Sequence, residues 1–304
     1  MTVVAEVIRS GFVESVHHGV VAVAPGPPPT ENDPIFPRSS NKPFQVVGML
    51  RSGLVPAAED DLAMISASHD GEPFHVERVL SMLAAAGLDA AALRCPADLP
   101  MGEAARNAHL RHGGEPEPVL MNCSGKHAGM LATCLVNGWD PESYLDPKHP
   151  LQLALADTVS DLAGEPIAAT GVDGCGAPVL AISPYALARA FLRLVESEPG
   201  TPERRVADAM RARPDLVAGT GSEDTVLMRA VPGLLVKRGA DGVVAAAMPG
   251  VGGVAVKISD GAARARYPVL LAALRRLGVS TPALDEVVLG GGVPVGEVRA
   301  VIQG

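Results

Sequence analysis

Strand-like segments at both ends of the chain flank a helical middle, and this arrangement constrains the fold more than any other feature of the sequence. Residues 3–23 alternate in polarity and then run through valines, which predicts two or three short antiparallel strands. Near the other end, Leu234–Lys237, Val243–Met248 and Val254–Ile258 predict a β-meander with glycine-bearing turns. Because strands and helices do not alternate regularly, we expect an α+β fold with an antiparallel sheet assembled from both chain termini.

The segments between these strands mostly show the apolar spacing of helices. Helices are predicted over Lys42–Leu54, His75–Ala86, Lys126–Val136, Leu151–Leu162, Tyr185–Val195 and Pro268–Leu277. Leu62–Ala67, a short apolar run that ends at Ser68, is predicted to be a buried strand. We expect the whole chain, residues 1–304, to form one unit with a helical subdomain around residues 70–165.

Composition and charge narrow the classes of function. The 304 residues are 47% hydrophobic, enough to bury a core, and carry a formal net charge of −9. An acidic chain without a block of Lys and Arg is not expected to bind nucleic acid, because that binding depends on clustered positive charge. Glu6 and Arg9 interrupt any signal-peptide core, and no run of about 18 uncharged apolar residues follows. We therefore expect a soluble, cytoplasmic protein without a membrane partner.

Lysine is scarce in this sequence. The 25 basic residues include only five lysines, which are Lys42, Lys126, Lys148, Lys237 and Lys257. Arg keeps its proton in a protein, whereas a desolvated Lys can lose its proton and act as a base or a metal ligand. The five lysines are therefore candidates for such roles. The alternative is that codon bias alone accounts for the small number of lysines.

Ser39 and Lys42 form the one Ser-x-x-Lys pattern in the chain. A lysine three residues after a serine lies close enough on a helix to take the proton that makes the hydroxyl a nucleophile. A helix N-cap serine followed by a solvated lysine gives the same pattern, so the pattern alone does not establish catalysis. Pro43 disfavours the α conformation at Lys42, which predicts a distorted first turn.

Four cysteines are too few and too far apart in the sequence to stabilise a chain of this size by disulfide bonds. A reducing compartment would keep them as thiols. They are Cys95, Cys123, Cys134 and Cys175. Cys123 is followed by Lys126, and Cys175 is bracketed by glycines. Two thiolates and a nitrogen or carboxylate suit zinc, but neither segment has the CxxC or HExxH spacing of the common sites. Two buried thiols are the other interpretation of the same residues.

Five short segments occur in the order found in the rhizobial-type (class 3, asparaginase II) L-asparaginases, and the chain resembles that family over nearly its whole length. The segments are Arg38–Pro43, Ser66–Glu72, Asn122–His127, Gly171–Gly176 and Val254–Lys257. That family is similar in fold to the serine β-lactamases and glutaminases. The resemblance therefore implies a fold of this type and a single asparaginase II-type unit.

The resemblance also implies roles for individual residues. Catalysis would use two Ser/Lys pairs, Ser39 with Lys42 and Ser68 with Lys257. Zinc would be held by Cys123, Lys126 and Cys175. The residues at the substrate would be Arg38, His127 and Asp173. Three of the five lysines would then stand where an unprotonated amine is required, and the protein would be a homodimer.

The implied reaction is hydrolysis of the side-chain amide of L-asparagine to L-aspartate and ammonia through an ester on Ser39. Lys42 would take the proton of Ser39, and Ser68 with Lys257 would relay a proton to the departing ammonia. Segment 219–225 departs from the family pattern, in which a basic residue is expected near position 222, so the substrate preference stays open. The alternatives are a glutaminase or β-lactamase-like serine amidohydrolase, and a non-catalytic zinc-binding or ligand-binding relative.

Overall fold

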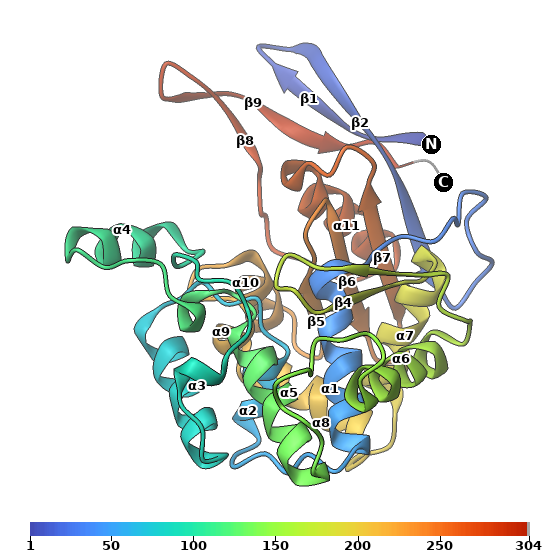
Figure 1. Ribbon diagram of the computed structural model, residues 1–304. Coiled ribbons are helices and arrows are strands. Elements are labelled where there is room, and N and C mark those ends of the chain that lie inside the picture. Colours follow the sequence, from blue (N-terminus) through green and yellow to red (C-terminus); the bar gives the residue numbers. More distant parts are fainter. Residues whose placement is uncertain (303–304) are drawn as a thin grey trace.

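A seven-stranded antiparallel sheet organises the computed structural model, which describes residues 1–302 (Figure 1). The strand order is β5-β6-β7-β2-β1-β9-β8. The strands are β1 (Thr2–Arg9), β2 (Phe12–Ala24), β5 (Leu235–Arg238), β6 (Val243–Met248), β7 (Gly252–Ile258), β8 (Val287–Gly290) and β9 (Val293–Ala300). Strands from the two chain ends lie side by side, since β2 pairs with β7 and β1 pairs with β9. The predicted antiparallel sheet from both termini is confirmed.

The β5–β6–β7 half of the sheet is buried on both faces. Residues 243–247 of β6 are all buried, which requires cover on each face because successive side chains point to opposite sides. Helices α7 (Pro184–Glu196) and α11 (Arg266–Arg276) both pack on β6 and β7. A Cβ at Gly253 would lie 2.1 Å from the Ala188 carbonyl oxygen, so glycine is needed where α7 meets β7. A polar side chain that points into the covered part of this half, such as that of Lys237, is therefore shielded from water.

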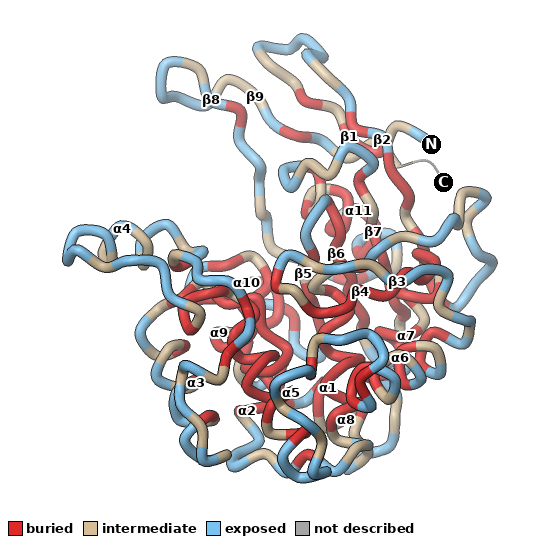
Figure 2. The backbone as a smooth tube through the Cα atoms, in the orientation of Figure 1, coloured by how far each residue is buried: buried red, intermediate tan, exposed pale blue. Residues whose placement is uncertain are grey.

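The outer half of the sheet projects from the body. The hairpin ends of β1–β2 and β8–β9 extend beyond the helices, and the tube in Figure 2 is largely exposed there. Phe12 at the first tip and Leu289 in the second hairpin are exposed. The hydrophobic core accordingly lies around β5, β6, β7 and the inner part of β2, on the side of the molecule where the helices gather.

The remaining helices lie beside the buried half of the sheet and pack together, except α4, which projects from the body (Figure 1). They are α1 (Lys42–Arg51), α2 (Asp60–Ile65), α3 (Pro73–Ala85), α4 (Glu103–Arg111), α5 (Ser124–Asn137), α6 (Pro150–Ala163), α8 (Pro202–Ala212), α9 (Pro214–Val217) and α10 (Glu223–Ala230). A separate two-stranded hairpin, β3 (Ala169–Val172) with β4 (Pro178–Ala181), carries residues 173–177 in its turn. None of the helices in residues 1–302 has the length and apolarity that crossing a bilayer requires.

One predicted element is wrong. The strand expected over Leu62–Ala67 is instead the helix α2, which begins at Asp60. A six-residue apolar run is compatible with a buried helix or a buried strand, and periodicity does not separate the two. Asp60 and Asp61 in the first turn favour the helix, because carboxylates there interact with the positive end of the helix dipole. The helices α4, α8, α9 and α10 and the two hairpins β3–β4 and β8–β9 were not predicted.

Candidate active site

A short 3₁₀ helix, η1 (Arg38–Asn41), carries Ser39 and leads directly into α1 at Lys42. Side chains three residues apart are eclipsed in a 3₁₀ helix, so Ser39 and Lys42 lie on the same side of this turn. Lys42 keeps helical backbone angles (φ −57°, ψ −42°) despite Pro43, and the predicted distortion takes the form of the 3₁₀ turn. Arg38 has φ +52°, a left-handed conformation that is unfavourable for an L-residue and is characteristic of functional sites.

The Ser68 hydroxyl lies between two lysine amines. Lys42 Nζ is 3.0 Å and Lys237 Nζ is 2.9 Å from Ser68 Oγ, and both are within hydrogen-bond distance. The backbone after α2 is held in place because Ser68 N donates to the Val217 carbonyl over 2.9 Å. Lys42 is 1% exposed and Lys237 is 0% exposed, so both amines are removed from water.

Lys257 does not lie at this centre. Its amine donates to the backbone carbonyl of Asp241, and it makes no contact with Ser68. The expected pair of Ser68 with Lys257 is therefore corrected to Ser68 with Lys237 and Lys42. The reason is the sheet order: Lys237 lies on β5, next to η1, and the Ser40 hydroxyl donates to the Lys237 carbonyl over 2.9 Å. The available signal was a lysine directly after the apolar run 234–236 in a predicted strand, a position that favours a buried amine.

Burial strongly lowers the pKa of Lys237, and the positive charge of Lys42 lowers it further, while the Asp224 carboxylate acts in the opposite direction. A neutral Lys237 amine offers a lone pair to the Ser68 hydroxyl proton. Ser68 Oγ can then accept a proton from Lys42 while it donates its own to Lys237. The two lysines are thus linked through one hydroxyl group.

A cavity of about 350 Å³ opens onto both candidate serines. Its lining residues are Ser39, Ser68, Asp70, Met101, Asn122, Ser222, Arg238, Gly239, Ala240 and Arg266. The Ser39 hydroxyl makes no hydrogen bond within residues 1–302, whereas the Ser68 hydroxyl contacts both lysines. The cavity therefore presents one free hydroxyl beside one that is linked to two amines.

The predicted metal ligands form a second buried cluster. Lys126 Nζ donates to Cys175 Sγ over 3.0 Å. The Cys123 thiol and the Lys126 ammonium hold the pKa of Cys175 far below its usual value, and contact with Cys175 and burial raise the pKa of Cys123. The directions of these two pKa shifts favour the thiolate form at Cys175 and the thiol form at Cys123. The cluster adjoins the cavity, because Cys123 follows Asn122 and donates to Asn122 Oδ1 over 3.1 Å.

The donor atoms of this cluster suit zinc, which prefers sulfur and nitrogen ligands. No three His, Cys, Asp or Glu side chains in residues 1–302 are arranged to hold a metal ion, so a three-ligand site here requires Lys126. Lys126 would have to release a proton, and its pKa is raised by Cys175 and Cys123 despite burial. Burial lowers the pKa of the neighbouring His127, and its contact with Cys175 acts in the opposite direction.

The three predicted substrate residues lie around the two clusters. Arg38 Nε donates to Asp173 Oδ1 over 2.8 Å, and Arg38 also pairs with Asp241. This contact joins the Ser39 turn to the β3–β4 turn that carries Cys175. His127 Nδ1 lies 2.6 Å from the buried Tyr144 hydroxyl. Arg38 and Asp173 therefore connect the two clusters, and His127 belongs to the thiol cluster.

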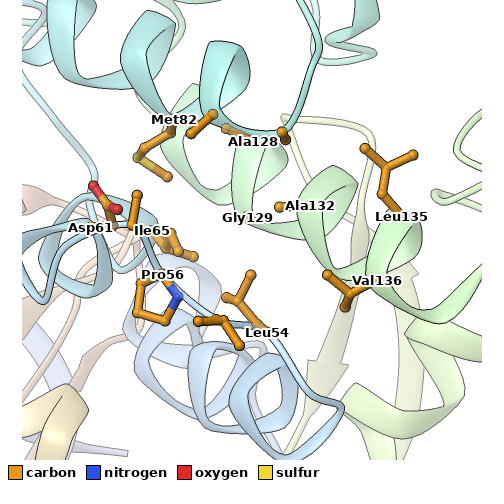
Figure 3. Close-up of a pocket in the computed structure, with 14 residues that line it drawn as sticks. Leu54, Pro56, Asp61, Ile65, Met82, Ala128, Gly129, Ala132, Leu135 and Val136 are labelled. Atoms are coloured by element: carbon orange, nitrogen blue, oxygen red, sulfur yellow. The ribbon is translucent and has the colours of Figure 1, made fainter.

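Another cavity, of about 420 Å³, is lined almost wholly by apolar side chains of α2, α3 and α5 and of the loop after α1 (Figure 3). Its one acidic residue, Asp61, pairs with Arg78 and accepts a hydrogen bond from the Ala58 amide. Apart from Asp61, its lining residues carry no side chain that could act as a nucleophile or a base. The polar chemistry of the chain is concentrated at the Ser39–Ser68 cavity instead.

The chain has a mixed α/β fold with an antiparallel sheet built from both chain ends. A buried Ser/Lys centre and an adjacent thiol pair lie at one cavity of this fold. The family model for L-asparaginase II matches residues 5–300. The chain belongs to the L-asparaginase II family, as the motifs predicted.

The comparisons with individual proteins are distant. No curated protein matches the chain. The structure titled "Crystal Structure Analysis of Mglu in its native form" is 16% identical with a TM-score of 0.43, and the match covers 84% of this chain and 64% of that chain. "Crystal Structure Analysis of Mglu in its tris and glutamate form" is 15% identical with a TM-score of 0.35, covering 90% and 63%. The chain thus spans less than two thirds of the length of these structures.

Proposed function

We propose that this protein is an L-asparaginase that hydrolyses the side-chain amide of L-asparagine by Ser/Lys catalysis, on a fold of the serine β-lactamase and glutaminase type. One observation carries the proposal: in a member of the L-asparaginase II family, a free serine hydroxyl and a serine linked to two buried lysines line the same cavity. Nucleophile, base and proton relay then lie within one site.

Ser39 is the proposed nucleophile because its hydroxyl is free in the cavity, whereas the Ser68 hydroxyl is engaged by two amines. Lys42 becomes a base when its proton passes through Ser68 Oγ to Lys237. Lys42 then takes the Ser39 proton as Ser39 Oγ attacks the amide carbon. Backbone N–H groups at the start of η1 are the candidate donors to the resulting oxyanion, and each well-aimed N–H contributes about 3 kcal/mol.

Collapse of the tetrahedral intermediate breaks the bond between carbon and nitrogen. The leaving nitrogen takes the proton held by the lysines, relayed through Ser68, and departs as ammonia. An aspartyl ester remains on Ser39. Water then attacks the ester, gives a proton to Lys42, and releases L-aspartate and the free serine, so that one amide and one water become one carboxylic acid and one ammonia.

The residues of the thiol cluster fit zinc, and Cys123, Lys126 and Cys175 would hold it. When bound, zinc supplies a positive charge that polarises oxygen atoms of a ligand. Arg38, Asp173 and His127 stay the predicted substrate-binding residues, because they surround this cluster and the Ser39 turn. We also propose that the chain acts as a single unit in a homodimer, which light scattering on the purified protein would test.

Ammonia release from L-asparagine and L-glutamine, together with turnover of a chromogenic β-lactam, tests the proposed activity. We expect L-asparagine to be the best substrate and Ser39→Ala to lose more than about 1,000-fold in kcat. Acid quenching during turnover should leave an aspartyl ester on the peptide that contains Ser39. An ester on Ser68 would reverse the roles of the serines, and faster release from glutamine would make the protein a glutaminase.

β-Lactam turnover without ammonia release would favour the β-lactamase-like alternative. If the protein binds zinc but hydrolyses none of the three substrates, the non-catalytic alternative holds. Ser39→Ala should still bind L-asparagine, because the substitution removes only the attacking oxygen.

A further inference from the structure

One cation in the Ser39–Ser68 cavity forms no direct ion pair within residues 1–302. The charged residues that line the cavity are Asp70, Arg238 and Arg266. Arg238 Nη2 donates to Asp70 Oδ1 over 2.8 Å, and these two charges offset each other. Arg266 forms no ion pair with any carboxylate in the described part of the chain. Arg266 is therefore the charged group of the lining without a direct ion-pair partner among residues 1–302, and its charge acts on Glu286 only without an ion pair, which leaves the guanidinium open to a ligand with an anionic group.

The guanidinium of Arg266 is held in a fixed orientation but keeps a hydrogen-bond donor without a partner. Its Nη1 donates to the Gly239 carbonyl over 2.8 Å, and the group lies over the Tyr267 ring, 5.0 Å from the ring centroid. Its Nε is buried without a hydrogen-bond partner. A buried N–H without a partner destabilises the fold, so a donor kept in this condition is available to a ligand.

The anchoring carbonyl fixes Arg266 relative to the catalytic residues. Gly239 follows Lys237 by two residues and lies against the Ser39 turn, where a Cβ at position 239 would be 2.5 Å from the Pro37 carbonyl oxygen. Arg266 is thus held at a defined place in the cavity that Ser39 and Ser68 also line, as recognition of one end of a small substrate requires.

The other two arginines near the site are already occupied. Arg38 binds the carboxylates of Asp173 and Asp241. Arg238 binds Asp70, and Glu223 lies 3.4 Å from it. A free carboxylate entering the cavity would have to displace an internal partner from either residue. Arg266 can bind a carboxylate directly, by donating two parallel N–H···O hydrogen bonds from the guanidinium to the carboxylate oxygens.

We propose that Arg266 receives the α-carboxylate of the substrate, so that the site takes amides that carry a free α-carboxylate. This assignment rests on the proposed function, because it places the substrate in the Ser39–Ser68 cavity. It predicts that an amide without that carboxylate is a poor substrate for the wild type, and that Arg266 is the source of the discrimination.

Binding of L-aspartate, the expected product, tests the assignment without catalysis. In calorimetry we expect Arg266→Gln to raise the Kd for L-aspartate by about 30-fold, as for loss of a hydrogen-bonded charge pair, and Arg266→Lys to retain part of the affinity. Arg275→Gln is the matched control, because Arg275 lies on the same helix and contacts Thr281 outside the cavity. Equal binding to wild type and Arg266→Gln, or binding to neither, overturns the assignment.

Turnover of L-asparagine and of its α-N-methylamide gives a second measurement. The wild type should prefer L-asparagine, and Arg266→Gln should lose that preference through a higher KM for L-asparagine with kcat little changed. A preference that persists in Arg266→Gln overturns the assignment, whereas absence of ammonia release by the wild type overturns the proposed function. Circular dichroism of each variant separates either result from misfolding.

Discussion

The Lys237 amine lies 2.9 Å from the Ser68 hydroxyl, although the two residues are 169 positions apart in the sequence. Lys42 lies 3.0 Å from the same oxygen. One hydroxyl has a single proton to donate, so it serves only one of the two amines at a time. This geometry supports a shared proton between the lysines and makes Lys237 as important to the proposed chemistry as Lys42.

Lys237→Met should reduce kcat for ammonia release by more than about 100-fold, because it removes the amine that takes a proton from Ser68. Lys257→Met is the matched control and should keep activity within about threefold, since its amine donates to the Asp241 carbonyl and does not contact Ser68. Steady-state assays with L-asparagine check both. A larger loss of activity in Lys257→Met than in Lys237→Met would instead support the pairing of Ser68 with Lys257.

The same Lys237→Met substitution should stabilise the fold by about 1 to 3 kcal/mol, because an apolar side chain of similar length replaces a fully buried amine. The folded pKa of Lys237 lies below 10.5, its unfolded value. Between these two values the unfolded chain holds a proton that the folded chain lacks, so stability rises with pH in that window. Urea unfolding at several pH values should show this rise in the wild type and a smaller one in the variant.

Activity should fall as the pH drops through the lowered pKa of Lys237, because protonation removes the acceptor for the Ser68 proton. The acidic limb of the profile of kcat/KM against pH measures this loss in the free enzyme. A profile that stays flat until general acid unfolding, as followed by circular dichroism, would contradict a neutral Lys237.

Lys42→Arg should also lose nearly all ammonia release, because a guanidinium keeps its proton and cannot act as the base. The positive charge is retained, so the substitution separates proton transfer from electrostatic stabilisation. Substantial activity in this variant would mean that Lys42 acts by charge alone. Thermal unfolding serves as the control, since the guanidinium is larger than the buried amine.

Gly239→Ala should lower kcat by about tenfold or more and cost about 1 to 3 kcal/mol, because the new Cβ would lie 2.5 Å from the Pro37 carbonyl oxygen and separate β5 from η1. Gly221→Ala is the control, since no atom lies within 4 Å of its added Cβ. Kinetics and urea unfolding on both variants check the contrast. Equal behaviour would show that the contact between β5 and η1 is not needed for activity.

Zinc should bind with a stoichiometry of about one ion per chain if Cys123, Lys126 and Cys175 form the metal site. Cys175→Ser should weaken that binding strongly, and Cys134→Ser should not, because Cys134 is a buried thiol outside the cluster. Elemental analysis after dialysis against zinc gives the answer. Chelation should lower the thermal stability of the wild type, because the bound ion stabilises only the folded chain. Zinc retained by Cys175→Ser would place the ion elsewhere.

Sequence patterns determined the broad architecture. Alternating and apolar runs at both ends predicted the antiparallel sheet, and long segments with helical periodicity predicted α5, α6 and α7 with ends one or two residues away. The local sequence was enough for these elements, because a strand or helix with one buried face repeats its apolar residues with the period of that structure. The sequence pattern failed at Leu62–Ala67, because a segment that is buried on all sides is apolar throughout and shows neither the helical nor the strand period.

The motifs also located Ser39, Lys42, Ser68 and the cysteine cluster, but the second lysine of the serine centre was decided by tertiary structure. Lys237 and Lys257 both follow valines in predicted strands, and the sequence does not say which strand adjoins the Ser39 turn. The sheet order puts β5 beside η1 and leaves Lys257 at the Asp241 carbonyl. Residue types and local spacing are encoded along the chain, whereas contacts across 169 positions depend on how the strands pair and how the helices pack on them.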